Sequence, residues 1–202
     1  ARGKVLDWVG GAVLDTIEVV TGLFKDKAVD MASAAVTQKM DGQVDPGVYQ
    51  LQPDQLVPLK GVGKKLVAVP APAKPDDPLL VLLHGTFSNT AGTFGKLWSQ
   101  HPTRVRALFN RYNNRVYALD HETLGISPLG NALMLVKALP QGARLHLVTH
   151  SRGGIVGEVL ARICGGRGLE NGDLALVAGS DYQNDLGELK ALAGESQKKK
   201  IK

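Results

Sequence analysis

A serine stands where a strand-like run passes directly into a helix-like run. The run 145–148 is strand-like, and Thr149-His150-Ser151-Arg152-Gly153-Gly154 follows it. A hydrolytic serine must project its hydroxyl from a sharp turn, and the residues two positions away must be small so that strand and helix can approach. Gly153 satisfies this requirement, whereas Thr149 adds bulk where the pattern Gly-x-Ser-x-Gly has its first glycine. Ser151 is thus a candidate nucleophile; the alternative is that it only caps the helix.

A second motif precedes the first by 67 positions, with one strand and two helices expected between them. The buried-strand pattern 79–83 is followed at once by His84-Gly85-Thr86-Phe87-Ser88. Acyl transfer passes through a tetrahedral oxyanion that two prearranged backbone N–H groups can stabilise. One donor is expected from Arg152, after the nucleophile, and the other from Thr86. The Arg152 side chain could instead be only a surface charge, and Phe87 only a core residue.

These motifs resemble the α/β-hydrolase superfamily, and within it bacterial lipase- and esterase-like enzymes with His-Gly-x and His-Ser-x-Gly-Gly motifs. The resemblance spans residues 65–166. Residues 86–88, 118–124 and 150–154 also resemble uncharacterised bacterial hydrolase domains that occur beside caspase-like CHAT modules. The resemblance implies a mostly parallel sheet with the nucleophile after its fifth strand, and cleavage of a carboxylic ester or acyl lipid through an acyl-enzyme on Ser151. We expect Phe87 and His121 to line the substrate pocket, and the chemistry needs no cofactor or metal.

The general base of this chemistry is not assigned. Triad order in this fold is Ser, then Asp or Glu, then His, but all histidines of the chain precede Ser151. We expect the sequence to be a piece of a longer protein that stops before the last strands; the alternative is a non-catalytic binding or scaffold module. His121, just after a strand, is the best placed substitute base, but a plain loop or pocket-lining histidine is the favoured interpretation. Three aspartates follow Ser151 in a Gly/Asn-rich stretch, 165–187, that we expect to form an insertion or lid, and none is assigned to the triad: Asp173, Asp181 and Asp185.

The elements needed to position these motifs can be read along the chain. Residues 1–60 are expected to be a helical N-terminal extension and a linker; the helix stripe could lie on a membrane but packing is the simpler role. The proline-containing stretch 42–58 should be a surface connection. Residues 61–202 alternate strand and helix, which predicts an α/β, doubly wound, mostly parallel sheet that is incomplete at its C-terminal end. We expect a further segment of the same protein or a partner chain to complete the sheet beyond strand 145–148.

Composition restricts the class of protein further. A hydrophobic share of 44% and a charged share of 21% are ordinary for a globular domain. The single cysteine, Cys164, excludes an internal disulfide framework and favours a reducing, cytoplasmic compartment. Acidic residues interrupt the apolar N-terminal region, so no transmembrane segment is expected. The net charge of +5 comes mostly from lysines at 198–202, and a solvated basic end is the simpler explanation than nucleic-acid binding.

Overall fold

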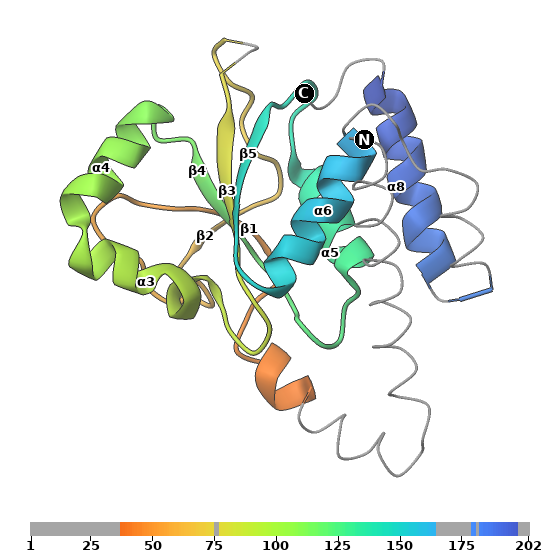
Figure 1. Ribbon diagram of the computed structural model, residues 1–202, viewed down its shortest axis with the longest axis horizontal. Helices are drawn as coiled ribbons and strands as arrows, with labels where there is room; N and C mark the ends of the chain where they lie inside the picture. The colour runs from red at the N-terminus through yellow and green to blue at the C-terminus, as the bar shows by residue number, and fades with distance from the viewer. Residues whose placement is uncertain (1–36, 75–76, 165–178, 181, 198–202) are drawn as a thin grey trace, which may run out of the picture.

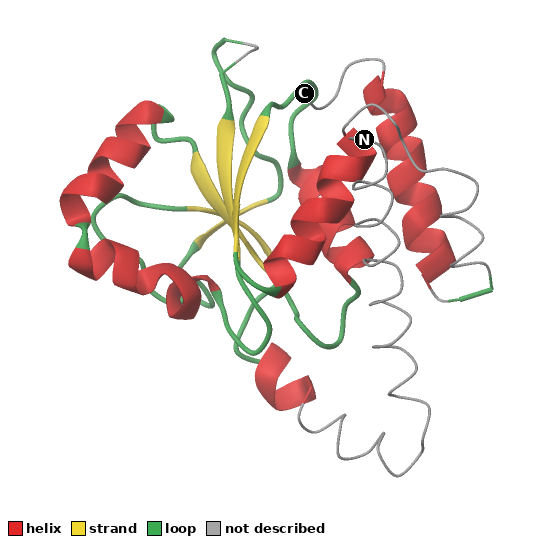
Figure 2. Ribbon diagram, viewed as in Figure 1, coloured by secondary structure: helices red, strands yellow, loops and turns green. Residues whose placement is uncertain are grey.

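Helices cover both faces of a central sheet in this protein. The computed structural model describes residues 37–74, 77–164, 179–180 and 182–197. Figures 1 and 2 show helices α3 (Thr90–Gln100) and α4 (Pro102–Arg111) on one face of the sheet. Helices α5 (Pro128–Ala138), α6 (Arg152–Cys164) and α8 (Tyr182–Gln197) lie on the other face. The fold is therefore α/β, with helices on either side of the sheet.

The sheet is mixed rather than mostly parallel. Its strands are β1 (Gly47–Gln50), β2 (Lys64–Leu66), β3 (Leu79–Leu83), β4 (Val116–Asp120) and β5 (Leu145–Thr149). They are arranged in the order β2-β1-β4-β3-β5. The neighbours β4, β3 and β5 are parallel, whereas β1 runs antiparallel to both β2 and β4. Parallel neighbours need a crossover helix between them, and no helix separates β1 from β2, so this pair forms an antiparallel hairpin.

Strand β1 corrects the expectation that residues 42–58 are a surface connection. Val48 and Tyr49 are buried, and β1 lies between β2 and β4 within the sheet. The Tyr49 hydroxyl donates a hydrogen bond of 2.7 Å to the Asp45 carbonyl, which satisfies its polar end. A strand of four residues between prolines is too short to show the alternation by which strands are recognised. Its hairpin partner β2 is short as well, because it ends at Leu66 and Val67 is 99% exposed.

Two apolar clusters hold the helices to the sheet. β3 is buried along its whole length, and its side chains point alternately into one cluster or the other. The cluster under α5, α6 and α8 is the larger, and that under α3 and α4 contains Trp98 and Phe109, whose rings meet edge to face at 6.0 Å. Burial of these apolar faces is the main favourable contribution to the free energy of folding.

The stretch 165–187, expected to be an insertion or lid, is described only in part. Residues 182–187 begin α8, which buries Leu186 and Leu189 and forms an ion pair of 2.8 Å between Lys137 and Glu188. That part is a packed helix. Asp173, Asp181 and the strand-like run 174–177 lie outside the described residues, as does the helix-like region up to residue 36.

Among the described helices, none is both long and apolar enough to cross a bilayer.

Candidate active site

Ser151 lies in a sharp turn between β5 and α6. Its backbone φ is 51°, in the left-handed region, and its side chain is exposed. A non-glycine residue in an unusual backbone conformation costs about 1–3 kcal/mol and persists only where the surroundings hold it. Two backbone hydrogen bonds across the turn hold Ser151 in this conformation, from Gly153 N–H to His150 O at 3.0 Å and from Gly154 N–H to Ser151 O at 2.8 Å. The turn has the backbone that a nucleophile elbow requires.

The loop after β3 lies directly against this turn. A Cβ atom at Gly85 would be 2.9 Å from Ser151 Cβ and 2.8 Å from His150 Nδ1, closer than side chains can approach. A Cβ atom at Gly153 would be 2.7 Å from His84 O. The His150 N–H also donates to Leu83 O at 3.0 Å. Glycine at both positions thus brings the two sequence motifs into contact.

Thr149, the departure from the glycine pattern, fits because α6 carries glycines opposite it. A Cβ atom at Gly157 would be 3.0 Å from Thr149 Cγ2, and one at Gly154 would be 3.8 Å from Thr149 Oγ1. The pattern Gly-x-Ser-x-Gly has its first small residue on the strand. In this protein the small residues at that contact, Gly154 and Gly157, are on the helix instead. The bulk of Thr149 therefore does not prevent the close approach of β5 and α6.

The two expected oxyanion donors follow the two residues that touch, because Thr86 comes after Gly85 and Arg152 after Ser151. Neither backbone N–H donates a hydrogen bond within the described part of the chain. The next residue, Phe87, has a φ of 58°, and its N–H donates to Thr123 Oγ1 at 3.3 Å. The loop that carries Thr86 is thereby attached to the loop after β4.

A buried polar network lies beneath these loops. The His84 Nε2 atom accepts the His121 N–H at 3.1 Å, so the proton is on Nδ1, which donates to Gly85 O at 3.0 Å. Asp120 Oδ1 accepts the N–H and the hydroxyl of Thr90, at 2.8 and 2.7 Å, and lies 3.5 Å from His84 Nε2. Burial lowers the pKa of His84, with smaller opposing effects of its bond to Gly85 and of Asp120. His84 is therefore neutral and holds the Gly85 carbonyl in place.

His121 is completely buried and stacks on His84, with ring centroids 4.1 Å apart. Its Nδ1 lies 3.2 Å from both Glu122 O and Asn131 Nδ2, while Nε2 has no hydrogen-bond partner among the described residues. Burial, and then the neighbouring His84, lower the pKa of His121 to about 3. The pocket-lining role expected of His121 needs an exposed ring. This ring instead packs under the site and supports His84.

Asp41 is a site residue that the sequence did not indicate. Its carboxylate, 7% exposed, accepts the backbone N–H groups of Thr123 at 2.8 Å, Leu124 at 3.3 Å and Gly125 at 2.6 Å. Arg152 also holds this loop, because its Nη2 donates to Ile126 O at 2.6 Å. Asp41 precedes Thr123 by 82 positions, and an Asp-Gly pair before a strand has no local pattern that distinguishes such a role from an ordinary turn.

The remaining sequence candidates lie as follows. Phe87 is exposed and Arg152 half-buried, so Phe87 is open to a ligand while the Arg152 guanidinium is used by the loop. Asp185, in the first turn of α8, packs beside the start of α5, because a Cβ atom at Gly130 would be 3.1 Å from its Oδ2. Within the described ranges, no three His, Cys, Asp or Glu side chains gather as a metal site.

The fold and the turn define an α/β protein with a serine elbow at the carboxyl ends of its parallel strands. A family model described as a domain of unknown function, DUF7379, matches residues 47–178. The chain belongs to this family, whose match begins at β1 and thus includes the hairpin strand. No curated protein and no solved structure matches the chain.

Proposed function

We propose that this protein is a serine hydrolase that cleaves a carboxylic ester or a lipid-like acyl group through an acyl-enzyme on Ser151. The observation that carries the proposal is the left-handed backbone of an exposed Ser151, with φ 51°, packed against Gly85 of the loop after β3. A serine that only caps a helix has extended backbone and no need of either feature.

In the proposed reaction Ser151 Oγ attacks the carbonyl carbon, and the carbonyl oxygen takes up negative charge. We assign the Thr86 and Arg152 N–H groups as donors to that oxygen; neither N–H donates to another described residue, which supports the assignment. The general base takes the Ser151 hydroxyl proton and returns it to the leaving alcohol as the intermediate collapses, which leaves the acyl group on Ser151. Water then attacks this ester with the help of the same base, so the acid is released and the Ser151 hydroxyl is restored. Phe87, exposed beside the turn, supplies apolar contact for an acyl chain.

The general base is not His84 or His121 in this proposal. Both are buried and neutral, and a histidine whose pKa is about 3 accepts a proton poorly at neutral pH. We place the base on a further segment or a partner chain beside β5, which is the edge strand of the described sheet.

The same two histidines favour one alternative, a non-catalytic module that binds an acyl ligand at this turn. In that case the buried pair is only a support for the loop, and Ser151 has no activating partner. The two functions differ in the reactivity of Ser151.

A fluorophosphonate probe separates them, because a serine attacks its phosphorus centre at an appreciable rate only in a site that stabilises the attack. We expect slow labelling of this chain, since a serine without its base retains only binding and oxyanion stabilisation, roughly 10³-fold over water. Ser151→Ala should abolish labelling, and Ser99→Ala, which alters another exposed serine, should leave it unchanged.

Labelling that survives in Ser151→Ala would exclude Ser151 as the nucleophile. A folded wild-type chain that stays unlabelled would favour the binding module.

A further inference from the structure

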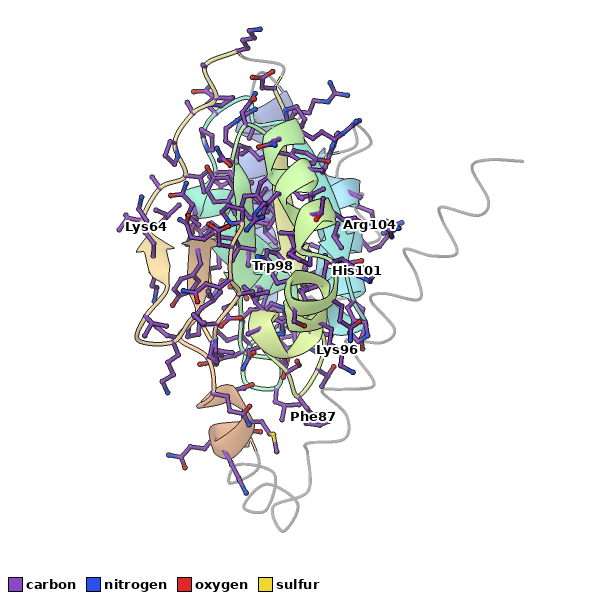
Figure 3. The ribbon with its side chains drawn as sticks, turned by 90° about the vertical axis from the view of Figure 1, so that its left-hand side faces the viewer. Lys64, Phe87, Lys96, Trp98, His101 and Arg104 are labelled. Atoms are coloured by element: carbon purple, nitrogen blue, oxygen red, sulfur yellow. The ribbon has the colours of Figure 1, made fainter. Side chains whose placement is uncertain are left out.

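The two helices on one face of the sheet, α3 and α4, contain Lys and Arg but no Asp or Glu. Residues 78–119, which include β3, α3, α4 and most of β4, contain five Lys or Arg residues and no Asp or Glu. Helices α3 and α4 lie together on the outside of the molecule in Figure 3. Unpaired positive charge gathered on such a layer attracts an oppositely charged surface.

Three of these cations are exposed and have no ion-pair partner in the described part of the chain: Lys96, Arg104 and Arg111. Arg104 and Arg111 are seven residues apart on α4 and so share one face of that helix. Arg106 and Arg115 are different, because they pair with Asp54 at 3.1 Å and with Asp77 at 3.4 Å.

Apolar side chains stand at one end of this face. Phe87 is 59% exposed, and the hydrogen bond from its N–H to Thr123 Oγ1 holds its loop in place. Leu97, next to Lys96 on α3, is 37% exposed. Figure 3 shows Phe87, Lys96 and Arg104 following one another along the α3–α4 layer. Phe87 also lies at the edge of the sheet where Ser151 lies, since β3 and β5 are parallel.

We propose that this face, defined by Phe87, Lys96, Leu97, Arg104 and Arg111, binds an anionic phospholipid surface. The cations attract lipid phosphates and carboxylates, and the two apolar side chains enter the interface. Phe87 connects this face to the sheet edge where Ser151 lies, so the proposed substrate, which rests on the proposed hydrolase function, is a lipid or lipid-like ester drawn from that membrane. The lipid binding itself does not depend on Ser151 being a nucleophile.

A single-stranded nucleic acid is the competing polyanion, and the aromatic residues of this layer argue against it. Base stacking needs exposed rings, but Trp98 is buried and donates its indole N–H to Gln52 O at 2.8 Å. Tyr112 and Phe109 are buried as well. Phe87 is the exposed aromatic residue of the layer, and its exposed neighbour on α3 is the aliphatic Leu97.

The test is sedimentation of the whole chain with vesicles of phosphatidylcholine alone or with phosphatidylserine. We expect binding only to the anionic vesicles, weaker at higher salt. Each basic residue near such a surface contributes about fivefold in affinity, so Lys96→Glu with Arg104→Glu should lower binding by at least about tenfold. Phe87→Ala should lower it in addition.

The matched control is Lys74→Glu with Lys190→Glu, two exposed lysines outside this face, which changes net charge equally. It should bind as the wild type does. Equal losses in the two double variants would assign binding to net charge or to the C-terminal lysines and overturn the proposal. Absence of binding to anionic vesicles, or binding only to a single-stranded oligonucleotide, would also overturn it. Thermal melting of each variant shows that it is folded, and fluorophosphonate labelling of Ser151 tests the hydrolase proposal separately.

Discussion

Individual residues beside and beneath the Ser151 turn hold it in place. Gly85 and Gly153 allow the contact, and His84 orients the Gly85 carbonyl through its Nδ1–H. His84 is in turn fixed by the backbone N–H of His121. This arrangement requires both imidazoles to stay neutral, because the acceptor atom of His84 is lost on protonation.

This requirement predicts a loss of stability in weak acid. Histidine titrates near pH 6.5 in an unfolded chain, whereas burial lowers the pKa of both residues in the folded state, that of His121 to about 3. Between these two pKa values the unfolded chain binds more protons than the folded one. The contribution of the histidines to the free energy of unfolding is therefore fully present above about pH 6.5. It falls as the pH falls, by up to about 1.4 kcal/mol per pH unit for each histidine. Urea unfolding at pH 7.5, 6 and 5 measures this slope.

The variant His121→Asn should show a smaller slope than wild type, even if it is less stable at pH 7.5. His101→Asn alters an exposed histidine and should keep the wild-type slope. Equal slopes in all three proteins would mean that His121 is not buried as a neutral ring.

At the scale of elements, β5 and α6 approach because a threonine on one faces glycines on the other. Ala in place of Gly157 would put its Cβ atom 3.0 Å from Thr149 Cγ2. Overpacking costs about 1–3 kcal/mol, whereas Gly→Ala within a helix gains about 0.5–1 kcal/mol. We therefore predict that Gly157→Ala destabilises the wild type by about 1 kcal/mol but stabilises the Thr149→Ala variant by about 0.5 kcal/mol.

Urea denaturation of the four proteins in this double-mutant cycle gives the coupling free energy, expected at about 1–2 kcal/mol. A coupling near zero would show that Thr149 and Gly157 are not in tight contact. The elbow would then tolerate Thr149 for another reason.

Elements with a strong local pattern were predicted close to their observed bounds. The strand-like runs 79–83 and 145–148 coincide with β3 and with all but the last residue of β5. β1 was not predicted, because its burial comes from β2 and β4 rather than from its own pattern. The same reason explains Asp41, whose three N–H donors lie more than eighty positions away. Local sequence predicted where Ser151 and Gly85 lie in their elements, but not the polar network that supports them.

At the scale of the whole molecule, the two ends of the sheet differ. β2 is short, with exposed lysines, and is a poor template for another strand. β5 has only β3 as a neighbour among the described strands, is half-exposed to exposed along its length, and carries Val148 at 45% exposure. An edge of this kind presents unpaired backbone N–H and C=O groups to another chain.

We therefore predict that the chain associates through β5 when it is alone in solution, with a copy of itself or with the partner that completes the site. Sedimentation velocity should show a sedimentation coefficient that rises with protein concentration. Val148→Lys should shift this equilibrium toward the monomer by at least about tenfold, because a lysine on an edge strand opposes pairing.

Val67→Lys is the matched control, since Val67 is 99% exposed and lies beside the opposite edge strand. It should associate like the wild type. A wild-type chain that stays monomeric at all concentrations would show that the β5 edge is already covered, and the base of the proposed reaction would then have to be sought within this chain, at the exposed His150 first.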